Sequence, residues 1–169
     1  MDQNVDKNIE IKDKLFLFLK KNKSKIIISL CSILILIVCV IIVDIYKERK
    51  NNSISEKYVQ AGLLLSNNEI ENAKLILEEI ILSKNKFYSI LALNILLEKN
   101  LENDKDKVLN YFEIVEKSNK IKTQKELIIF KKALYLLKNS EIKHGEKILN
   151  DIVDSESNLK ALAEEILSK

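Results

Sequence analysis

The sequence predicts an all-α protein in two parts, a transmembrane helix near the N-terminus and a series of helical hairpins after it. Three observations support this prediction. An uncharged run of 18 residues, Ile26–Val43, is long enough to cross a bilayer. The rest of the chain repeats apolar residues with the period of a helix and contains no proline. Asparagine-rich breaks divide it into segments of the length expected for short helices.

The apolar run has the length and composition of a membrane span. Fourteen of its 18 residues are Ile, Leu or Val, and a helix of this length covers about 27 Å, close to the roughly 30 Å of a bilayer's hydrocarbon core. These side chains favour insertion by roughly 4–8 kcal/mol. Tyr46 suits the far interface, so we predict a transmembrane helix over residues 26–46. A buried core helix or strand is the alternative, but the rest of the chain is too short to cover such a run on all sides.

Charge near the span predicts its retention and its orientation. The segment that follows, DIYKERK, has no small-x-small cleavage site, so we expect the anchor to remain on the protein. Seven lysines precede the span, whereas four basic residues follow it within a similar distance. By the positive-inside rule, residues 1–25 form a cytoplasmic basic tail and the C-terminal part lies on the other side.

The distribution of charge and cysteine argues against a nucleic-acid-binding protein and against a disulfide-stabilised domain. The formal net charge is +3, and residues 1–25 alone carry seven lysines against four acids. Residues 51–169 carry 18 lysines against 19 acids, so we expect contact with membrane lipid at the basic tail and no nucleic-acid binding by the remainder. Cys31 and Cys39 both lie in the apolar run, so the C-terminal part needs no disulfide.

Helix-forming segments fill the chain after a linker predicted at residues 47–54. Two capping boxes, Ser53–Glu56 and Thr123–Glu126, predict helix starts at these points. Short loops between successive helices favour antiparallel hairpins within one helical domain, residues 55–169. The predicted helices are Ser55–Ser66, Glu69–Ser83, Phe87–Lys99, Lys105–Lys117, Gln124–Lys138, Glu141–Asp154 and Asn158–Ser168.

Small residues in this domain recur at a spacing that predicts a repeat. Ala61 precedes Ala73 by 12 positions, and Ala133 precedes Gly145 by 12. The two pairs are 72 positions apart, about two periods of 34 residues plus a short insertion. Small side chains at these places let the two helices of a hairpin approach closely. The spacing predicts a tetratricopeptide-like helical-hairpin solenoid of about three and a half repeats, with a degenerate middle unit at residues 87–118.

The layout resembles the single-span, tetratricopeptide-like ancillary subunit of the bacterial Sec translocon, the YfgM-like family. The resemblance covers the basic head FLKKNKSK, the anchor and the first two helical pairs, and is strongest over Asn85–Leu97. The chain departs from the repeat pattern at Lys57, where a bulky tryptophan is usual. The resemblance implies a bacterial inner (plasma) membrane protein with a periplasmic C-terminal domain. It also implies translocon subunits, envelope chaperones or exported clients as partners.

The sequence offers no site for chemistry. It contains no G-x-x-x-x-G-K, G-x-S-x-G or H-E-x-x-H motif. His144 is the only histidine, and we expect it to be a solvated side chain. The adjacent acids Glu78-Glu79 and Glu164-Glu165 point about 100° apart on a helix, which predicts solvated faces. We therefore predict that the protein is not an enzyme and holds no cofactor or metal.

A binding surface is the remaining prediction for a functional site. In the 34-residue register, one face of each hairpin's first helix lines a concave groove suited to an extended or helical apolar peptide. The alternative is that the same residues form the core. The predicted groove residues are Tyr58, Gly62, Leu65, Ala92, Leu96, Leu127, Phe130, Leu134 and Leu137.

Three functional hypotheses follow. The first is a membrane-anchored protein-interaction scaffold that assists translocon-linked export or the hand-over of secreted proteins to chaperones. The second is a membrane-tethered assembly factor for another envelope complex. The third is a structural protein that forms homo-oligomers through an exposed helix face.

Overall fold

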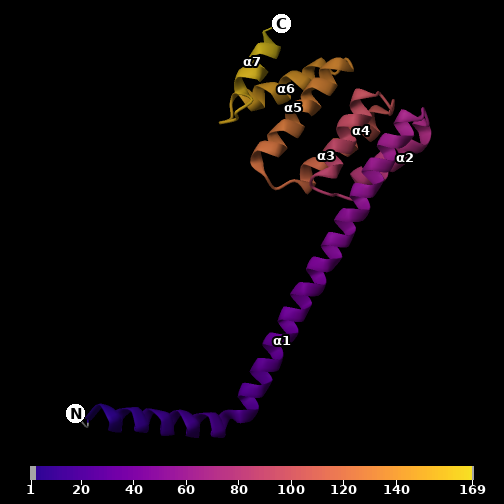
Figure 1. Ribbon diagram of the computed structural model, residues 1–169. Helices are drawn as coiled ribbons and strands as arrows, with labels where there is room; N and C mark the ends of the chain where they lie inside the picture. The colour runs from indigo at the N-terminus through magenta and orange to yellow at the C-terminus, as the bar shows by residue number, and fades with distance from the viewer. Residues whose placement is uncertain (1–2, 169) are drawn as a thin grey trace. The chain divides into compact units, whose positions relative to one another are not determined.

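The computed structural model describes residues 3–168, which form seven α-helices and contain no strand. The all-α prediction is confirmed over this range. Two compact units divide the chain, one up to Arg49 and the other from Lys50 onward, and α1 contributes to both. The helices, labelled in Figure 1, are α1 Gln3–Ser66, α2 Ile70–Leu82, α3 Tyr88–Glu98, α4 Lys105–Ser118, α5 Lys122–Lys138, α6 Ile142–Val153 and α7 Lys160–Leu167.

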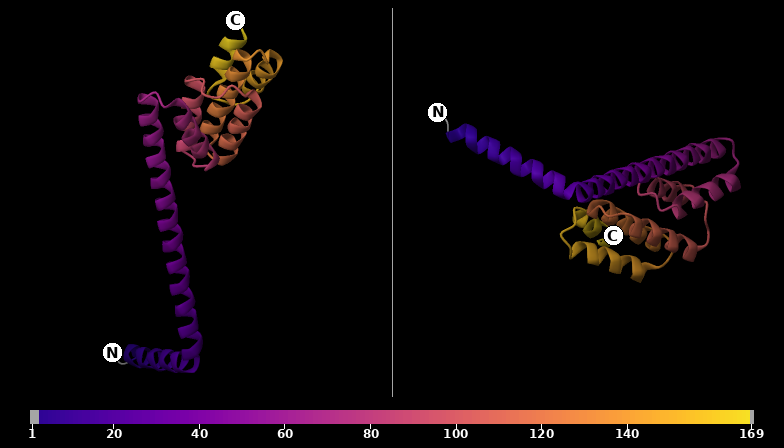
Figure 2. Two further views of the ribbon diagram at one scale, coloured as in Figure 1. Left: turned by 90° about the vertical axis from the view of Figure 1, so that its right-hand side faces the viewer. Right: turned by 90° about the horizontal axis from the view of Figure 1, so that it is seen from below.

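The N-terminal unit is the first part of α1, which bends at Asn22 (Figure 1, Figure 2). The backbone of Asn22 leaves the helical region, with φ −108° and ψ 16°, and asparagine is a weak helix former. Within the described residues, one helical stretch beyond this bend, Ile27–Ser66, is long and apolar enough to cross a membrane. Ser32 donates its hydroxyl hydrogen to the carbonyl of Ile28 at 2.9 Å, which satisfies this polar group inside the helix. Met1 and Asp2 of the predicted tail lie outside the described residues.

The helix bounds predicted after residue 68 agree with the structure to within two residues at each end. The predicted linker at residues 47–54 is wrong, because α1 continues through it. This stretch has no proline or glycine to end the helix, and Ile54 is buried in the core that follows. Both predicted capping boxes are also wrong: Ser53 lies inside α1, and α5 begins at Lys122, one residue before Thr123.

Four helices end with a residue in the left-handed conformation two positions beyond the last helical residue. In three of these turns the next amide completes a second bond, as from Glu141 to the carbonyl of Leu136 at 2.9 Å. Glycine usually occupies this position, but the chain has only two glycines. The asparagine-rich breaks predicted from the sequence are therefore largely helix ends. The left-handed residues are Asn68, Lys84, Asn100 and Ser140.

The C-terminal unit buries two hydrophobic clusters, one formed by α1 to α4 and the other by α5 to α7. Helix α5 contributes to both, because Ile128 belongs to the first cluster whereas Phe130 and Ala133 belong to the second. The first cluster contains Ile54, Ala61, Leu77, Ile80, Ile81, Ala92, Leu93, Leu96, Val108, Tyr111, Phe112, Val115 and Ile128. The second contains Phe130, Ala133, Leu149, Ile152 and Ala163.

The small residues singled out by their spacing are all buried. Ala61, Ala73 and Ala133 have no exposed surface. A Cβ atom added to Gly145 would lie 2.7 Å from Cγ of Leu137 and 3.0 Å from the carbonyl oxygen of Ala133. The close approach of α5 and α6 therefore requires glycine at position 145.

Candidate functional site

A cleft of about 370 Å³ lies between α3 and α5 in the C-terminal unit. It combines amide, ammonium and carboxylate groups with apolar side chains, a mixture typical of sites that bind organic ligands or peptide segments. The lining residues are Asn94, Leu96, Leu97, Glu98, Asn100, Glu102, Asn103, Lys131, Leu134, Tyr135, Lys138 and Asn139.

Two lysines of α5 reach across this cleft to asparagines on and just after α3. Lys131 Nζ donates to Asn94 Oδ1 at 2.7 Å, and Lys138 Nζ donates to Asn100 Oδ1 at 3.3 Å. An asparagine oxygen carries no formal charge, so neither contact is an ion pair.

The apolar wall of the cleft is continuous with the first core cluster. Leu96 is 1% exposed, and the half-buried ring of Tyr135 packs on Phe112 with centroids 5.8 Å apart. Burial raises the pKa of Tyr135, so this phenol remains neutral around physiological pH.

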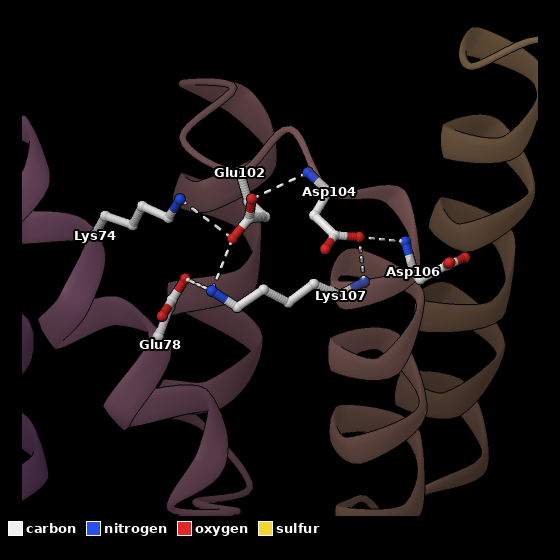
Figure 3. A network of polar contacts seen from close by, with 6 residues as sticks. All are labelled: Lys74, Glu78, Glu102, Asp104, Asp106 and Lys107. Carbon is white, nitrogen blue, oxygen red and sulfur yellow. Dashed lines mark hydrogen bonds and ion pairs between the residues drawn. The ribbon is translucent and has the colours of Figure 1, made fainter.

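The loop between α3 and α4 forms one edge of the cleft and is fixed by a polar network (Figure 3). The Glu102 carboxylate is 7% exposed and lies 3.2 Å from Lys74 Nζ and 2.9 Å from Lys107 Nζ. Lys107 also contacts Glu78 at 2.7 Å. Asp104 caps α4, because its carboxylate accepts the amide of Asp106 at 3.0 Å and that of Lys107 at 3.1 Å. The network joins α2, this loop and the first turn of α4.

The same contacts shift the pKa values of the network. The Asp104 amide, which donates to the Glu102 carboxylate at 3.0 Å, and then Lys107 lower the pKa of Glu102 to about 2. Hydrogen bonds from Lys107 to Glu78 and Glu102 raise the pKa of Lys107. Burial raises the pKa of Tyr111, under the Lys107 ammonium, to about 12. Each group therefore holds its charged or neutral form over a wide pH range, which suits a structural support better than a proton-transfer site.

The structure brings together only some of the predicted groove residues. Leu96 and Leu134 line the cleft, and Leu127 lines a smaller cavity of about 30 Å³ beside it. Ala92 and Phe130 are core side chains, as the alternative interpretation held. The remaining four lie elsewhere: Tyr58 packs on the first cluster, Leu137 packs on the second, and Gly62 and Leu65 lie on α1.

One prediction about the exposure of the titratable residues is wrong. Glu78 was predicted to be solvated, but its side chain is 13% exposed because it pairs with Lys107. His144 is 73% exposed, as predicted, and its Nδ1 lies 2.9 Å from Glu141. Among the described residues, no group of three or more His, Cys, Asp or Glu side chains is placed to hold a metal ion.

Sequence reasoning missed the polar side of the cleft. The pairs Asn94–Lys131 and Asn100–Lys138 are 37 and 38 positions apart, close to the predicted period of 34 residues, and this spacing was the available signal. No family model, curated protein or solved structure matches the chain.

Proposed function

We propose that this protein is a single-pass membrane protein whose C-terminal unit is a tetratricopeptide-like solenoid that binds segments of other proteins. The observation that carries the proposal is the contrast between an apolar helix with no protein cover and a separate unit with its own core and cleft. The described side chains of the apolar stretch are exposed, with Leu34 64% and Leu36 65% exposed. Water is a poor environment for such a surface, so a bilayer is the solvent that fits it.

Contacts between helices support the solenoid. In a stack of equivalent hairpins, side chains about one period apart lie side by side. Asn51 accepts from Asn85, 34 positions later, and Ser55 accepts from Tyr88, 33 positions later. Lys105 at the start of α4 pairs with Glu141, 36 positions later, at the start of α6. Helices α4 and α6 are the second helices of their hairpins. First helices thus contact first helices, and second helices contact second helices.

The cleft supports protein binding over small-molecule chemistry. It lies between the first helices of two successive hairpins and offers two lysines together with leucine and tyrosine side chains. An extended or helical segment with an acidic group and apolar neighbours fits this mixture. With the N-terminus in the cytoplasm, the unit faces the periplasm, where newly exported proteins and chaperones are the partners that the overall layout favours.

A photocrosslinking residue at Lys138, which lines the cleft and is exposed, tests the proposal in the intact membrane protein. A matched probe at Lys143, exposed on α6 and outside the cleft lining, is the control. We expect translocon subunits or exported proteins to be captured from position 138 during active secretion, and not from position 143. Equal labelling from both positions, or none from either, would contradict the proposal.

The other two hypotheses give different products in this experiment. An assembly factor would yield one partner in fixed proportion whatever the secretion load. A self-associating structural protein would yield a product of twice the chain mass.

A further inference from the structure

Two loops at one end of the C-terminal unit combine lysines with exposed apolar side chains. The loop between α2 and α3 carries Lys84 and Lys86, and Phe87 beside them is 59% exposed. The loop between α4 and α5 carries Lys120, and Ile121 beside it is 57% exposed. We call these two loops the basal loops.

The basal loops lie at the same end of the unit. A small cavity is lined together by Ile90 and Leu93, near the start of α3, and by Gln124 and Leu127, near the start of α5. Because these residues contact a common space, the loops that precede the two helices are neighbours. This cavity therefore places Phe87 and Ile121 at one end of the helix stack.

This end is also where the chain passes into the unit from the apolar segment. Asn85 donates its side-chain amide to Asn51 at 2.9 Å, and Tyr88 donates its hydroxyl to Ser55 at 2.8 Å. Val43, the last residue of the apolar run, is only seven positions before Lys50. Even a fully extended chain of that length spans no more than about 25 Å. The basal loops are therefore held close to any bilayer that contains residues 26–43.

The chemistry of the basal loops fits the surface of that bilayer. An aromatic or aliphatic side chain flanked by lysines inserts into the headgroup region while the ammonium groups meet lipid phosphates. Three basal-loop lysines, Lys84, Lys86 and Lys120, are exposed, and so is Lys122 at the first position of α5, which we count with them as the basal lysines. The third loop at this end, between α6 and α7, carries Asp154 and Glu156 and lacks this character.

We propose that the basal loops dock on the anionic lipid surface of the membrane that holds the anchor, with Phe87 and Ile121 inserted among the headgroups. This inference rests on the proposed membrane span. Docking would limit the orientations of the helical unit and so fix the direction in which its cleft is presented to partners.

The absence of tryptophan from the chain allows a direct test. The full chain carrying Phe87→Trp or Ile121→Trp is reconstituted in vesicles of phosphatidylcholine with phosphatidylglycerol, with and without brominated acyl chains. Leu63→Trp is the control, since Leu63 is 61% exposed on α1 near the opposite end of the unit. We expect blue-shifted emission and bromine quenching at positions 87 and 121, and neither at position 63.

Removing charge should weaken the docking in steps. Each substitution of a basal lysine by glutamine should lower the equilibrium constant for loop contact about fivefold. In vesicles of phosphatidylcholine alone, which carry no net charge, the unsubstituted chain should also show weakened loop contact.

Three results would overturn the inference. Unquenched emission at positions 87 and 121 in a chain that floats with the vesicles means that the span is correct and the docking is not. A blue shift that grows with protein density in lipid-free detergent means that a second copy covers the loops. A chain that does not float with vesicles removes the proposed span itself, and with it the basis for docking.

Discussion

The two units of this protein place the same kinds of side chain in opposite environments. Leu34 and Leu36 of the N-terminal unit are about two thirds exposed, whereas Leu77 of the C-terminal unit has no exposed surface. The second unit brings helices together so that leucine and isoleucine cover one another. The described part of the first unit is a single helix with a stretch long and apolar enough to cross a membrane. The proposed bilayer around the first unit and the protein core of the second would be two solutions to the same hydrophobic requirement.

The largest expected effect is on membrane insertion and comes from introducing a charge into the apolar run. Leu34→Lys, near the middle of the run, should cost about 3 kcal/mol of insertion free energy. The measurement is the fraction of full-length protein that resists carbonate extraction and floats with vesicles. Leu63→Lys, at a similarly exposed leucine in the C-terminal unit, should leave this fraction unchanged. Equal retention of both variants with the parent protein would argue against a membrane span.

Acid should weaken the C-terminal unit through Glu102. Because the folded state lowers the pKa of this carboxyl from 4.5 to about 2, its stabilisation is complete above pH 4.5 and is lost as the pH falls towards 2. Glu102→Gln should lower the free energy of unfolding by about 2–3 kcal/mol at neutral pH, measured by urea denaturation of the full chain in detergent.

The pH dependence separates this electrostatic role from simple packing. The difference between the parent protein and Glu102→Gln should shrink between pH 4.5 and about 2. Glu113→Gln, which removes an exposed i,i+4 pair with Lys117, should have a much smaller effect at any pH. A Glu102→Gln defect that is independent of pH would indicate lost packing instead.

The two glycines sharpen the comparison between exposed and packed helix surfaces. Gly145→Ala should destabilise the C-terminal unit by about 1–3 kcal/mol, because the new methyl group overlaps Leu137 and the Ala133 carbonyl oxygen. Gly62→Ala has no atom within 4 Å of the new methyl group. It should stabilise the helix by about 0.5–1 kcal/mol. Thermal unfolding of the two variants should therefore shift in opposite directions, and a parallel shift would disprove the close approach of α5 and α6.

The smallest expected effect concerns a helix end. Ser140 has φ 64° just beyond α5, where glycine has no steric cost. Ser140→Gly should raise the free energy of unfolding by less than about 1 kcal/mol. Asn139→Gly, one residue earlier at φ −100°, should not stabilise the protein. A loss of stability in Ser140→Gly would show that this turn does not require the left-handed conformation.

The sequence by itself determined the all-α class, six of the seven helices to within two residues, and the one stretch apolar enough for a membrane. These are properties of local composition and periodicity, so no distant contact is needed to read them. The continuation of α1 through residues 47–54 was missed because the serine before Ile54 looks like a helix cap. In the structure Ile54 is buried against later helices, and this contact favours a continuous helix through the stretch.

Only the tertiary structure decided which predicted groove residues face a cleft and which are core. Ala92, Leu96 and Phe130 were all predicted to line the groove, yet only Leu96 among them lines the cleft. The polar partners Asn94 and Lys131 are 37 positions apart and meet only because α3 and α5 lie on either side of the cleft. Helical periodicity gives the side of a helix on which a residue lies, but what covers that side depends on helices encoded far away in the chain.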